Sequence, residues 1–288
     1  MNAVTTPVDR ARTETAALRI RDLEIGYVTR DGLSSAVRGV SLDVARGEFV
    51  GLVGESGCGK STIAQAILRV LRAPGVITGG SIELSGVDVL AADHRQLRRL
   101  RWARAAIVMQ NSLAALNPVQ RVGAQIGEAM TAHGGSSRTV GELLDMVGID
   151  PARARSYPHE FSGGMRQRAA IAMSLALEPD LLIMDEPTTA LDVIVQQEIL
   201  LTVRRLQKEQ GFGVLFITHD LPLLLRHADR AVVMRDGIVL EEATTSALRG
   251  TGGADPYTRK LLAALPRPAA KGSVPASRRG AMAEGGRR

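Results

Sequence analysis

The chain has 288 residues, 45% of them hydrophobic, and a formal net charge of +6 at pH 7. This length and apolar content suffice for one large domain, or for a domain that carries an inserted lobe. The longest nearly apolar stretch, 169–177, is far shorter than the roughly 20 residues of a membrane-spanning helix, and the N-terminus lacks a signal-peptide core. We therefore expect a soluble globular protein, with any membrane spans supplied by other chains.

The positive charge is concentrated at the C-terminus. Residues 267–288 hold six Lys or Arg against one Glu, so the rest of the chain is close to neutral. This distribution argues against a broad nucleic-acid-binding face and favours a disordered basic tail. The single cysteine, Cys58, excludes an intrachain disulfide and a cysteine-based metal cage, and predicts a cytoplasmic protein.

In chain order, the apolar patterns predict an α/β protein with a mainly parallel sheet. Residues 1–17 are polar, without periodicity, and are expected to be a disordered N-terminus that precedes an ordered domain over 18–266. Strands are expected over 18–27, 37–44, 49–53, 81–84, 106–109, 181–184, 214–218, 231–234 and 238–240. The first two strands read as an N-terminal antiparallel hairpin, because a turn signal separates them.

Helices are expected over 63–71 and 193–210, and an inserted helical lobe over about 111–178. The arginine-rich run 95–104 is interpreted as a solvated helix face rather than a binding patch. The closing pair of strands, 231–234 and 238–240, flanks an Asp-Gly turn and predicts a hairpin.

A phosphate-binding loop follows the strand expected at 49–53. The residues that match the pattern G-x-x-x-x-G-K-[ST] and the position after it are Gly54, Glu55, Ser56, Gly57, Cys58, Gly59, Lys60, Ser61 and Thr62. Glycines let backbone N–H groups approach a triphosphate, and the positive end of the next helix adds to the attraction. Lys60 is expected to reach the β- and γ-phosphates and Ser61 to bind Mg²⁺, so the loop predicts ATP and Mg²⁺ as ligands.

Two adjacent carboxylates, Asp185 and Glu186, end the apolar strand expected at 181–184. Ligands of open α/β sheets bind at the carboxyl ends of the strands. Asp185 is therefore expected to hold Mg²⁺, and Glu186 to polarise an attacking water. The alternative is a pair of solvated carboxylates that open a turn before Pro187.

The segment 161–168 separates this chain from phosphate-loop ATPases in general. Ser162 can cap the following helix, and Gly163 and Gly164 leave its amides open to an anion. The alternative is an ordinary capped helix in a core. With its Met165, the segment resembles the signature of ATP-binding cassette (ABC) proteins. This resemblance implies that the helix end contacts the γ-phosphate bound by a second subunit, which gives two composite sites per dimer.

Other residues resemble ABC elements in the expected order. The resemblance implies that Tyr27 stacks on adenine, that Gln110 senses Mg²⁺ and the γ-phosphate, that Asp192 belongs to a loop between dimer partners, and that His219 contacts the γ-phosphate. Taken singly, Tyr27 fits a sheet aromatic, Gln110 a surface amide and His219 a strand-end histidine. The remaining histidines with no partner at metal-ligand spacing are expected at the surface: His94, His133 and His227.

The motifs are similar to those of the peptide and nickel importer branch of the ABC family, and of the first of its two unequal ATPases. The segments that carry this similarity are 111–118, 157–168, 185–193 and 255–262, with Met165 in place of the common Gln and Asp255 in place of the usual His. The similarity implies an ATPase peripheral to the cytoplasmic face of the cell membrane. It also implies a heterodimer with a second ABC ATPase, two membrane permeases and an extracytoplasmic solute-binding protein.

The cargo implied is a peptide or a nickel- or metallophore-like solute, chosen by the other subunits. No iron–sulfur cluster is expected, since the tail has no cysteine, and no nucleic acid is expected as a partner. Two alternatives remain open: a non-transport ABC ATPase that acts on DNA or ribosomes, and an accessory ATPase of a phosphonate-processing complex.

Overall fold

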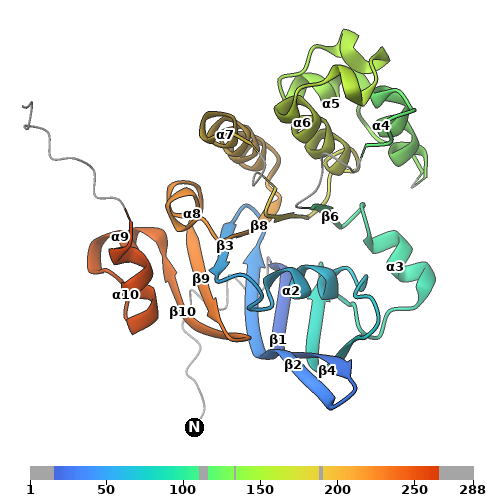
Figure 1. Cartoon of the computed structure of the whole chain (residues 1–288). Helices are drawn as coiled ribbons and strands as arrows, with labels where there is room; N and C mark the ends of the chain where they lie inside the picture. The colour runs from blue at the N-terminus through green and yellow to red at the C-terminus, as the bar shows by residue number, and fades with distance from the viewer. Residues whose placement is uncertain (1–15, 110–115, 133, 188–190, 266–288) are drawn as a thin grey trace, which may run out of the picture.

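The computed structural model describes residues 16–109, 116–132, 134–187 and 191–265, which contain two β-sheets and a helical lobe (Figure 1). The smaller sheet is antiparallel, with the strand order β2 (Gly32–Ala45), β1 (Ala16–Thr29), β4 (Gly75–Leu84) and β5 (Val87–Asp88). The larger sheet has the order β10 (Ile238–Thr244), β9 (Arg230–Arg235), β3 (Phe49–Gly54), β8 (Gly213–Thr218), β7 (Leu181–Asp185) and β6 (Ala105–Val108). Its neighbours are parallel except for β10, which runs antiparallel to β9. The predicted α/β class with a mainly parallel sheet is confirmed.

The central strands of the larger sheet, β3, β7 and β8, are buried on both faces, as their continuous apolar sequences require. Side chains of β3 alternate, so Phe49 packs in one core and Leu52 in the other. The first core lies against the helical side of the sheet, where Phe49 and Phe216 meet edge to face with ring centroids 6.0 Å apart. The second core joins the larger sheet to the antiparallel sheet. Because β3 and β7 both pair with β8 in parallel, the carboxyl ends of the three strands lie at one common edge.

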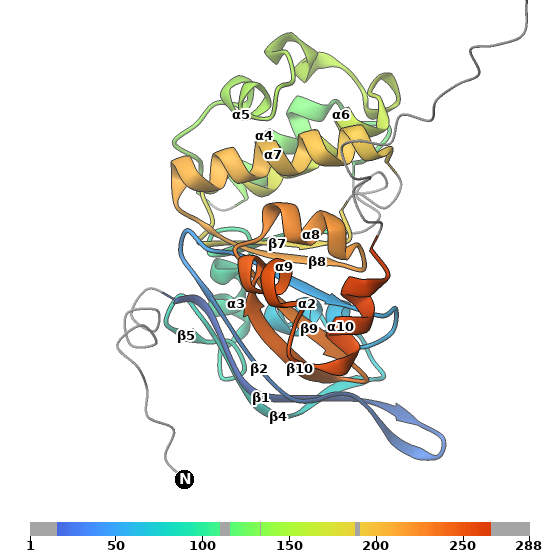
Figure 2. The same cartoon turned by 90° about the vertical axis from the view of Figure 1, so that its left-hand side faces the viewer.

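The helices flank this sheet and form a lobe above it (Figures 1 and 2). Those near the sheets are α2 (Lys60–Ile67), α3 (His94–Leu100), α7 (Val193–Gln210), α8 (Leu221–His227), α9 (Thr245–Thr251) and α10 (Pro256–Ala263). Those between β6 and β7 are α4 (Val122–Thr131), α5 (Val140–Met146), the 3₁₀ turns η2 (Pro151–Arg155) and η3 (Pro158–Glu160), and α6 (Gly163–Ser174). None of the helices in the described ranges combines the length and apolarity that crossing a membrane would require.

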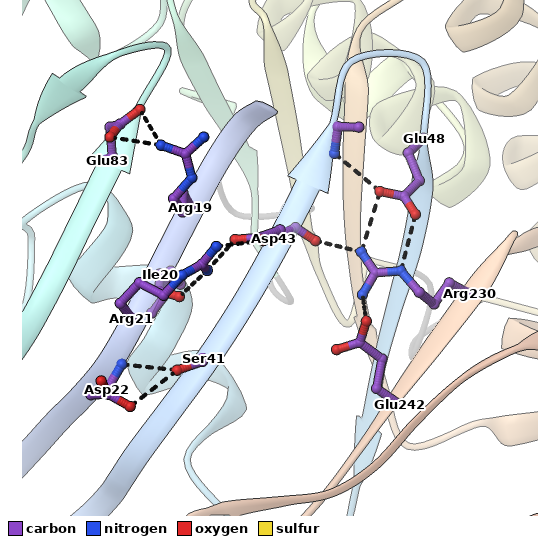
Figure 3. A network of polar contacts seen from close by, with 11 residues as sticks. Arg19, Ile20, Arg21, Asp22, Ser41, Asp43, Glu48, Glu83, Arg230 and Glu242 are labelled. Carbon is purple, nitrogen blue, oxygen red and sulfur yellow. Dashed lines mark hydrogen bonds and ion pairs between the residues drawn. The ribbon is translucent and has the colours of Figure 1, made fainter. Parts of the chain in front are cut away.

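Arg230 ties the two sheets together (Figure 3). Its guanidinium donates from Nε to Oε1 of Glu48 at 3.0 Å, from Nη1 to Oε1 of Glu242 at 2.5 Å, and from Nη2 to the carbonyl oxygen of Asp43 at 2.5 Å. Burial alone would lower the pKa of Arg230, but the two carboxylates raise it above its ordinary value. Asp43 belongs to β2, so one buried cation joins the antiparallel sheet to β9 and β10.

Some elements differ from the predicted ranges. Strand β1 begins at Ala16, because Ala16 pairs with Ala45 across the hairpin. Strand β4 begins at Gly75, six residues before the predicted start at 81, since pairing with β1 extends it through two glycines of low strand propensity. The helix after the phosphate loop starts and ends earlier than predicted, whereas α7 has the predicted bounds.

Candidate functional site

The phosphate loop connects β3 to α2 and depends on two left-handed glycines. Gly57 has φ +81° and Gly59 has φ +102°, conformations that side chains disfavour. A Cβ on Gly59 would lie 2.6 Å from the carbonyl oxygen of Ala36, and one on Gly54 would lie 2.2 Å from that of Met234. The loop therefore accepts only glycine where it passes between β2 and β9, as a close backbone cradle for phosphate requires.

Lys60 lies inside this loop with 5% exposure. Its Nζ donates to the carbonyl oxygens of Gly54 and Glu55, both at 2.8 Å, and lies 3.6 Å from Sγ of Cys58. Neutral carbonyls thus hold the ammonium group, and the structure gives it no carboxylate partner within the described ranges. A phosphate that enters the loop therefore meets a positive charge that no carboxylate contacts directly in the described ranges.

Ser61 and Asp185 connect the loop to the end of β7. Oγ of Ser61 donates to Oδ1 of Asp185 at 3.0 Å. Asp185 is 5% exposed, and burial raises the pKa of its carboxyl, with the charge of Glu186 adding to the rise and Ser61 and Lys60 opposing it. Ser61 and Asp185, each expected to hold Mg²⁺, therefore lie next to each other at one edge of the sheet.

Glu186 follows Asp185 in the chain, but its side chain points in a different direction, because its backbone has a left-handed φ of +45°. For a glutamate this conformation costs about 1–2 kcal/mol, and such strain concentrates at functional sites. Its amide donates to the carbonyl of Ile217 at 2.9 Å, and its Oε1 lies 3.2 Å from Nδ1 of His219. The ends of β7 and β8 thereby bring a carboxylate and an imidazole together. This contact orients Glu186 beside the loop.

Tyr27 lies at the far end of β1, next to the loop helix. Its hydroxyl is 3.1 Å from Oγ1 of Thr62. The ring is half-buried at this point of the hairpin, so the structure places it beside the loop. Its stacking on a base remains a prediction.

The signature segment lies away from the phosphate loop. Ser162 caps α6, with Oγ accepting from the amide of Met165 at 3.2 Å, as predicted. Both views show α6 in the lobe, well separated from α2 (Figures 1 and 2). A Cβ on Gly164 would lie 2.7 Å from Cγ1 of Val195, and one on Gly163 would lie 3.1 Å from Cδ2 of Leu191. The glycines therefore also allow α6 to pack against the start of α7, a role that sequence reasoning missed.

Asp192 caps α7 beside the signature segment and accepts from the amides of Ile194 and Val195 at 3.1 and 3.0 Å. It therefore belongs with Ser162, Gly163, Gly164 and Met165 rather than with the phosphate loop. The structure brings together the loop 54–62, Tyr27, Asp185, Glu186 and His219. Gln110 lies outside the described residues, as does His133.

One predicted surface histidine is wrong. His94 is exposed, but His227 is only 8% exposed, because the largely apolar α8 packs against α7, α9 and the larger sheet. Sequence reasoning also missed Tyr257 of α10, 9% exposed. Burial raises its pKa, and the neighbouring Glu55 of the phosphate loop raises it further. The similarity of the segment 255–262 to a family motif was the one sequence feature that could have pointed to this contact between Tyr257 and the phosphate loop.

The site suits a nucleotide with a divalent cation. In the described part of the chain no cluster of three or more His, Cys, Asp or Glu could cage a metal by itself. The hydroxyl of Ser61 and the carboxylate of Asp185 supply two hard oxygen donors next to the phosphate cradle, and Mg²⁺ is commonly held by such a pair together with substrate phosphates. The residues present therefore fit this metal, which would neutralise phosphate charge.

Comparison with known proteins agrees with this geometry. Residues 37–189 match the ABC transporter family. A probable peptide ABC transporter ATP-binding protein of Sinorhizobium fredii is 44% identical over 259 residues, 86% of this chain and 76% of the relative. The oligopeptide transport ATP-binding protein of Bacillus subtilis is 40% identical over 260 residues, 88% of this chain and 72% of the relative.

Solved structures share the fold. The dimeric post-hydrolysis structure of the ATP-binding cassette MJ0796 with ADP and Pi has a TM-score of 0.69 at 26% identity, covering 79% of this chain and 98% of that one. A subunit of a Clostridium perfringens ABC transporter has a TM-score of 0.70 at 26% identity, covering 83% and 92%. With a phosphate loop, paired carboxylates and an ABC signature in one fold, the chain belongs to the ABC transporter ATP-binding family and is an ATPase.

Proposed function

We propose that this chain is the ATP-hydrolysing subunit of a bacterial peptide importer, peripheral to the cytoplasmic face of the membrane. The observation that carries the proposal is the contact of Glu186 with His219 at 3.2 Å, beside the hydrogen bond of Ser61 to Asp185 at 3.0 Å. Peptide transport is named for relatives at 40–46% identity. Nickel- or metallophore-like solutes are the alternative cargo, and uptake of labelled dipeptides and of nickel separates the two.

In the proposed reaction, water attacks the γ-phosphorus in line and ADP leaves. Glu186 accepts the water proton, and His219, which lies beside this carboxylate, contacts the γ-phosphate. Lys60 reaches the β- and γ-phosphates from the loop, and Tyr27 stacks on adenine. Mg²⁺, held by Ser61, Asp185 and Gln110, would supply charge neutralisation at the phosphates.

The proposed functional unit is a heterodimer with a second ABC ATPase. Within one chain the signature residues Ser162–Met165 lie in the lobe, away from the phosphate loop (Figures 1 and 2). A partner facing this chain would bring its own signature helix end to the γ-phosphate, and Asp192 would lie at the same interface. Closure on ATP and reopening after hydrolysis would act on two permease subunits fed by a solute-binding protein.

Affinity purification of the Glu186→Gln chain from its native cells, with Mg-ATP and mild detergent, tests this assembly. Glutamine keeps the shape but cannot accept the proton, so the ATP-bound dimer is trapped with its partners. The Lys60→Ala chain is the control, because it loses the phosphate contact that closes the dimer. Mass spectrometry should identify two permeases and a second ATPase only with Glu186→Gln. Recovery of ribosomal, DNA-associated or soluble enzyme partners alone would overturn the transport assignment and leave the ATPase site intact.

A further inference from the structure

A hollow lies on the face of the molecule formed by α7, α8 and α9. The three helices are close together in Figure 2, and α8 packs against both neighbours. The hollow has a volume of about 740 Å³, and none of the catalytic, phosphate-loop or signature residues lines it. Four cations line it, Arg204, Lys208, Arg226 and Arg249, against one carboxylate, Asp229. We call it the α7–α9 pocket.

The carboxylate in this pocket is already used. Arg204 binds both oxygens of Asp229, one of them at 2.9 Å, and the amide of Phe49 donates to Oδ2 at 2.9 Å. Burial would raise the pKa of Asp229, but these hydrogen bonds and the charges of Arg204 and Lys208 hold it below its ordinary value. Asp229 therefore stays ionised and paired with Arg204. Its single charge is taken up mainly by Arg204 and only weakly by Lys208, so it cannot neutralise the other three cations of the pocket.

Those three cations have no acidic partner among the described residues. Lys208 and Arg226 are exposed, and Arg249 donates only to Thr245, to its carbonyl at 3.3 Å and its hydroxyl at 3.5 Å. Three like charges in one hollow repel one another unless an anion lies between them. Exposed hydroxyls of Thr244 and Ser246, 3.0 Å apart, line the same hollow and add hydrogen-bonding groups.

A buried histidine completes the lining. His227 is 8% exposed, and its Nε2 has no hydrogen-bond partner in the described ranges. Buried polar nitrogens in folded proteins nearly always have a partner, in protein or in solvent. Burial, Arg226 and Arg204 lower the pKa of His227, so its ring is neutral and can serve as one donor or acceptor. Because His227 lines the pocket, its ring reports on whether the pocket is occupied.

We propose that the α7–α9 pocket binds a small, multiply charged oxyanion of the phosphate class, free in solution. Guanidinium groups bind such oxygens in a bidentate manner. With Asp229 paired to Arg204, the charges of Lys208, Arg226 and Arg249 are left for an anion to neutralise. A hollow also fits a compact anion better than a nucleic-acid strand, which requires a basic surface spread over many residues. The site is separate from the nucleotide site, so its occupancy does not depend on the proposed transport function.

Histidine NMR provides a local test. The chain, with labelled histidine side chains and saturated with Mg-ADP, is titrated with inorganic phosphate at constant ionic strength. The His227 signal is assigned through a His227→Asn variant. We expect a saturable shift of this signal, an affinity about tenfold weaker in Arg226→Gln, and loss of the shift in the triple variant Lys208→Gln, Arg226→Gln, Arg249→Gln.

The matched control is Arg95→Gln, Arg98→Gln, Arg99→Gln, which removes three exposed charges from α3 and should keep the phosphate response. An unchanged His227 signal in the wild-type chain would overturn the proposal. So would an equal response of the triple pocket variant, because the phosphate would then bind elsewhere. A response to phosphatidylglycerol vesicles but not to free phosphate would overturn the assignment to a soluble anion and point to a lipid headgroup.

Discussion

Replacing Arg230 by methionine should destabilise the protein strongly. Arg230 is 4% exposed, and Glu48, the more buried of its two carboxylate partners, has a side chain only 11% exposed (Figure 3). Methionine fills similar volume but removes the bonds to Glu48, Glu242 and the carbonyl of Asp43. Glu48 would then keep its charge in a buried position, and β2 would lose its polar connection to β9.

The magnitude follows from this burial. Removing one partner of a buried ion pair typically costs about 3–5 kcal/mol, because the remaining charge is desolvated without compensation. Glu242 adds little, since its side chain is 42% exposed and water can replace the lost bond. For a chain of this size, the same loss corresponds to a fall in Tm of about 6–20 °C.

Urea unfolding followed by far-UV circular dichroism measures the change. The double variant Arg230→Met, Glu48→Gln should recover much of the loss, because no charge is then buried. The control is Glu209→Gln, which breaks the exposed i,i+4 pair with Arg205 at 3.1 Å and should cost about 0.5 kcal/mol or less. If Arg230→Met cost no more than Glu209→Gln, or if the double variant were as unstable as the single one, the burial argument would be refuted.

Four further outcomes are expected. Glu186→Gln should lower steady-state ATP hydrolysis by about 10²–10⁴-fold with ATP affinity unchanged; unaltered turnover would remove Glu186 from its role. Because the pKa of Asp185 is raised in the folded protein, its ionised form lowers stability above that pKa, and the cost disappears below the pKa of the unfolded state. Asp185→Asn should therefore raise the Tm of the nucleotide-free protein at neutral pH and leave it unchanged in strong acid. The same variant should abolish stabilisation by Mg²⁺. Gly59→Ala should weaken ATP binding at least tenfold, since φ is +102° and the new Cβ would meet the carbonyl of Ala36, with calorimetric titration as the assay. Deleting residues 267–288 should leave nucleotide affinity unaltered in the same titration, and a large loss would show that the tail is not a dispensable extension.

Local patterns in the sequence were enough for much of the fold. The bounds of α7, Val193–Gln210, match the prediction because a capping Asp192 and a terminal Gly211 mark both ends. The phosphate loop was identifiable from the fixed spacing of its motif. The strands β3, β7 and β8 were identifiable as short apolar runs next to such motifs. Helix α8 was missed, because a proline and a continuous run of leucines conceal the helical period.

The sequence by itself indicated which residues are expected to perform the chemistry: the loop 54–62, Asp185 and Glu186 through their motifs, and His219 through its resemblance to an ABC element. Only the tertiary structure decided which of them meet. The contact of Glu186 with His219 depends on β7 pairing with β8, and the separation of Ser162 from the loop depends on how the lobe packs against α7. The burial of His227 and Arg230 likewise depends on elements distant in sequence, because burial and pairing are sums over neighbours that no local pattern contains.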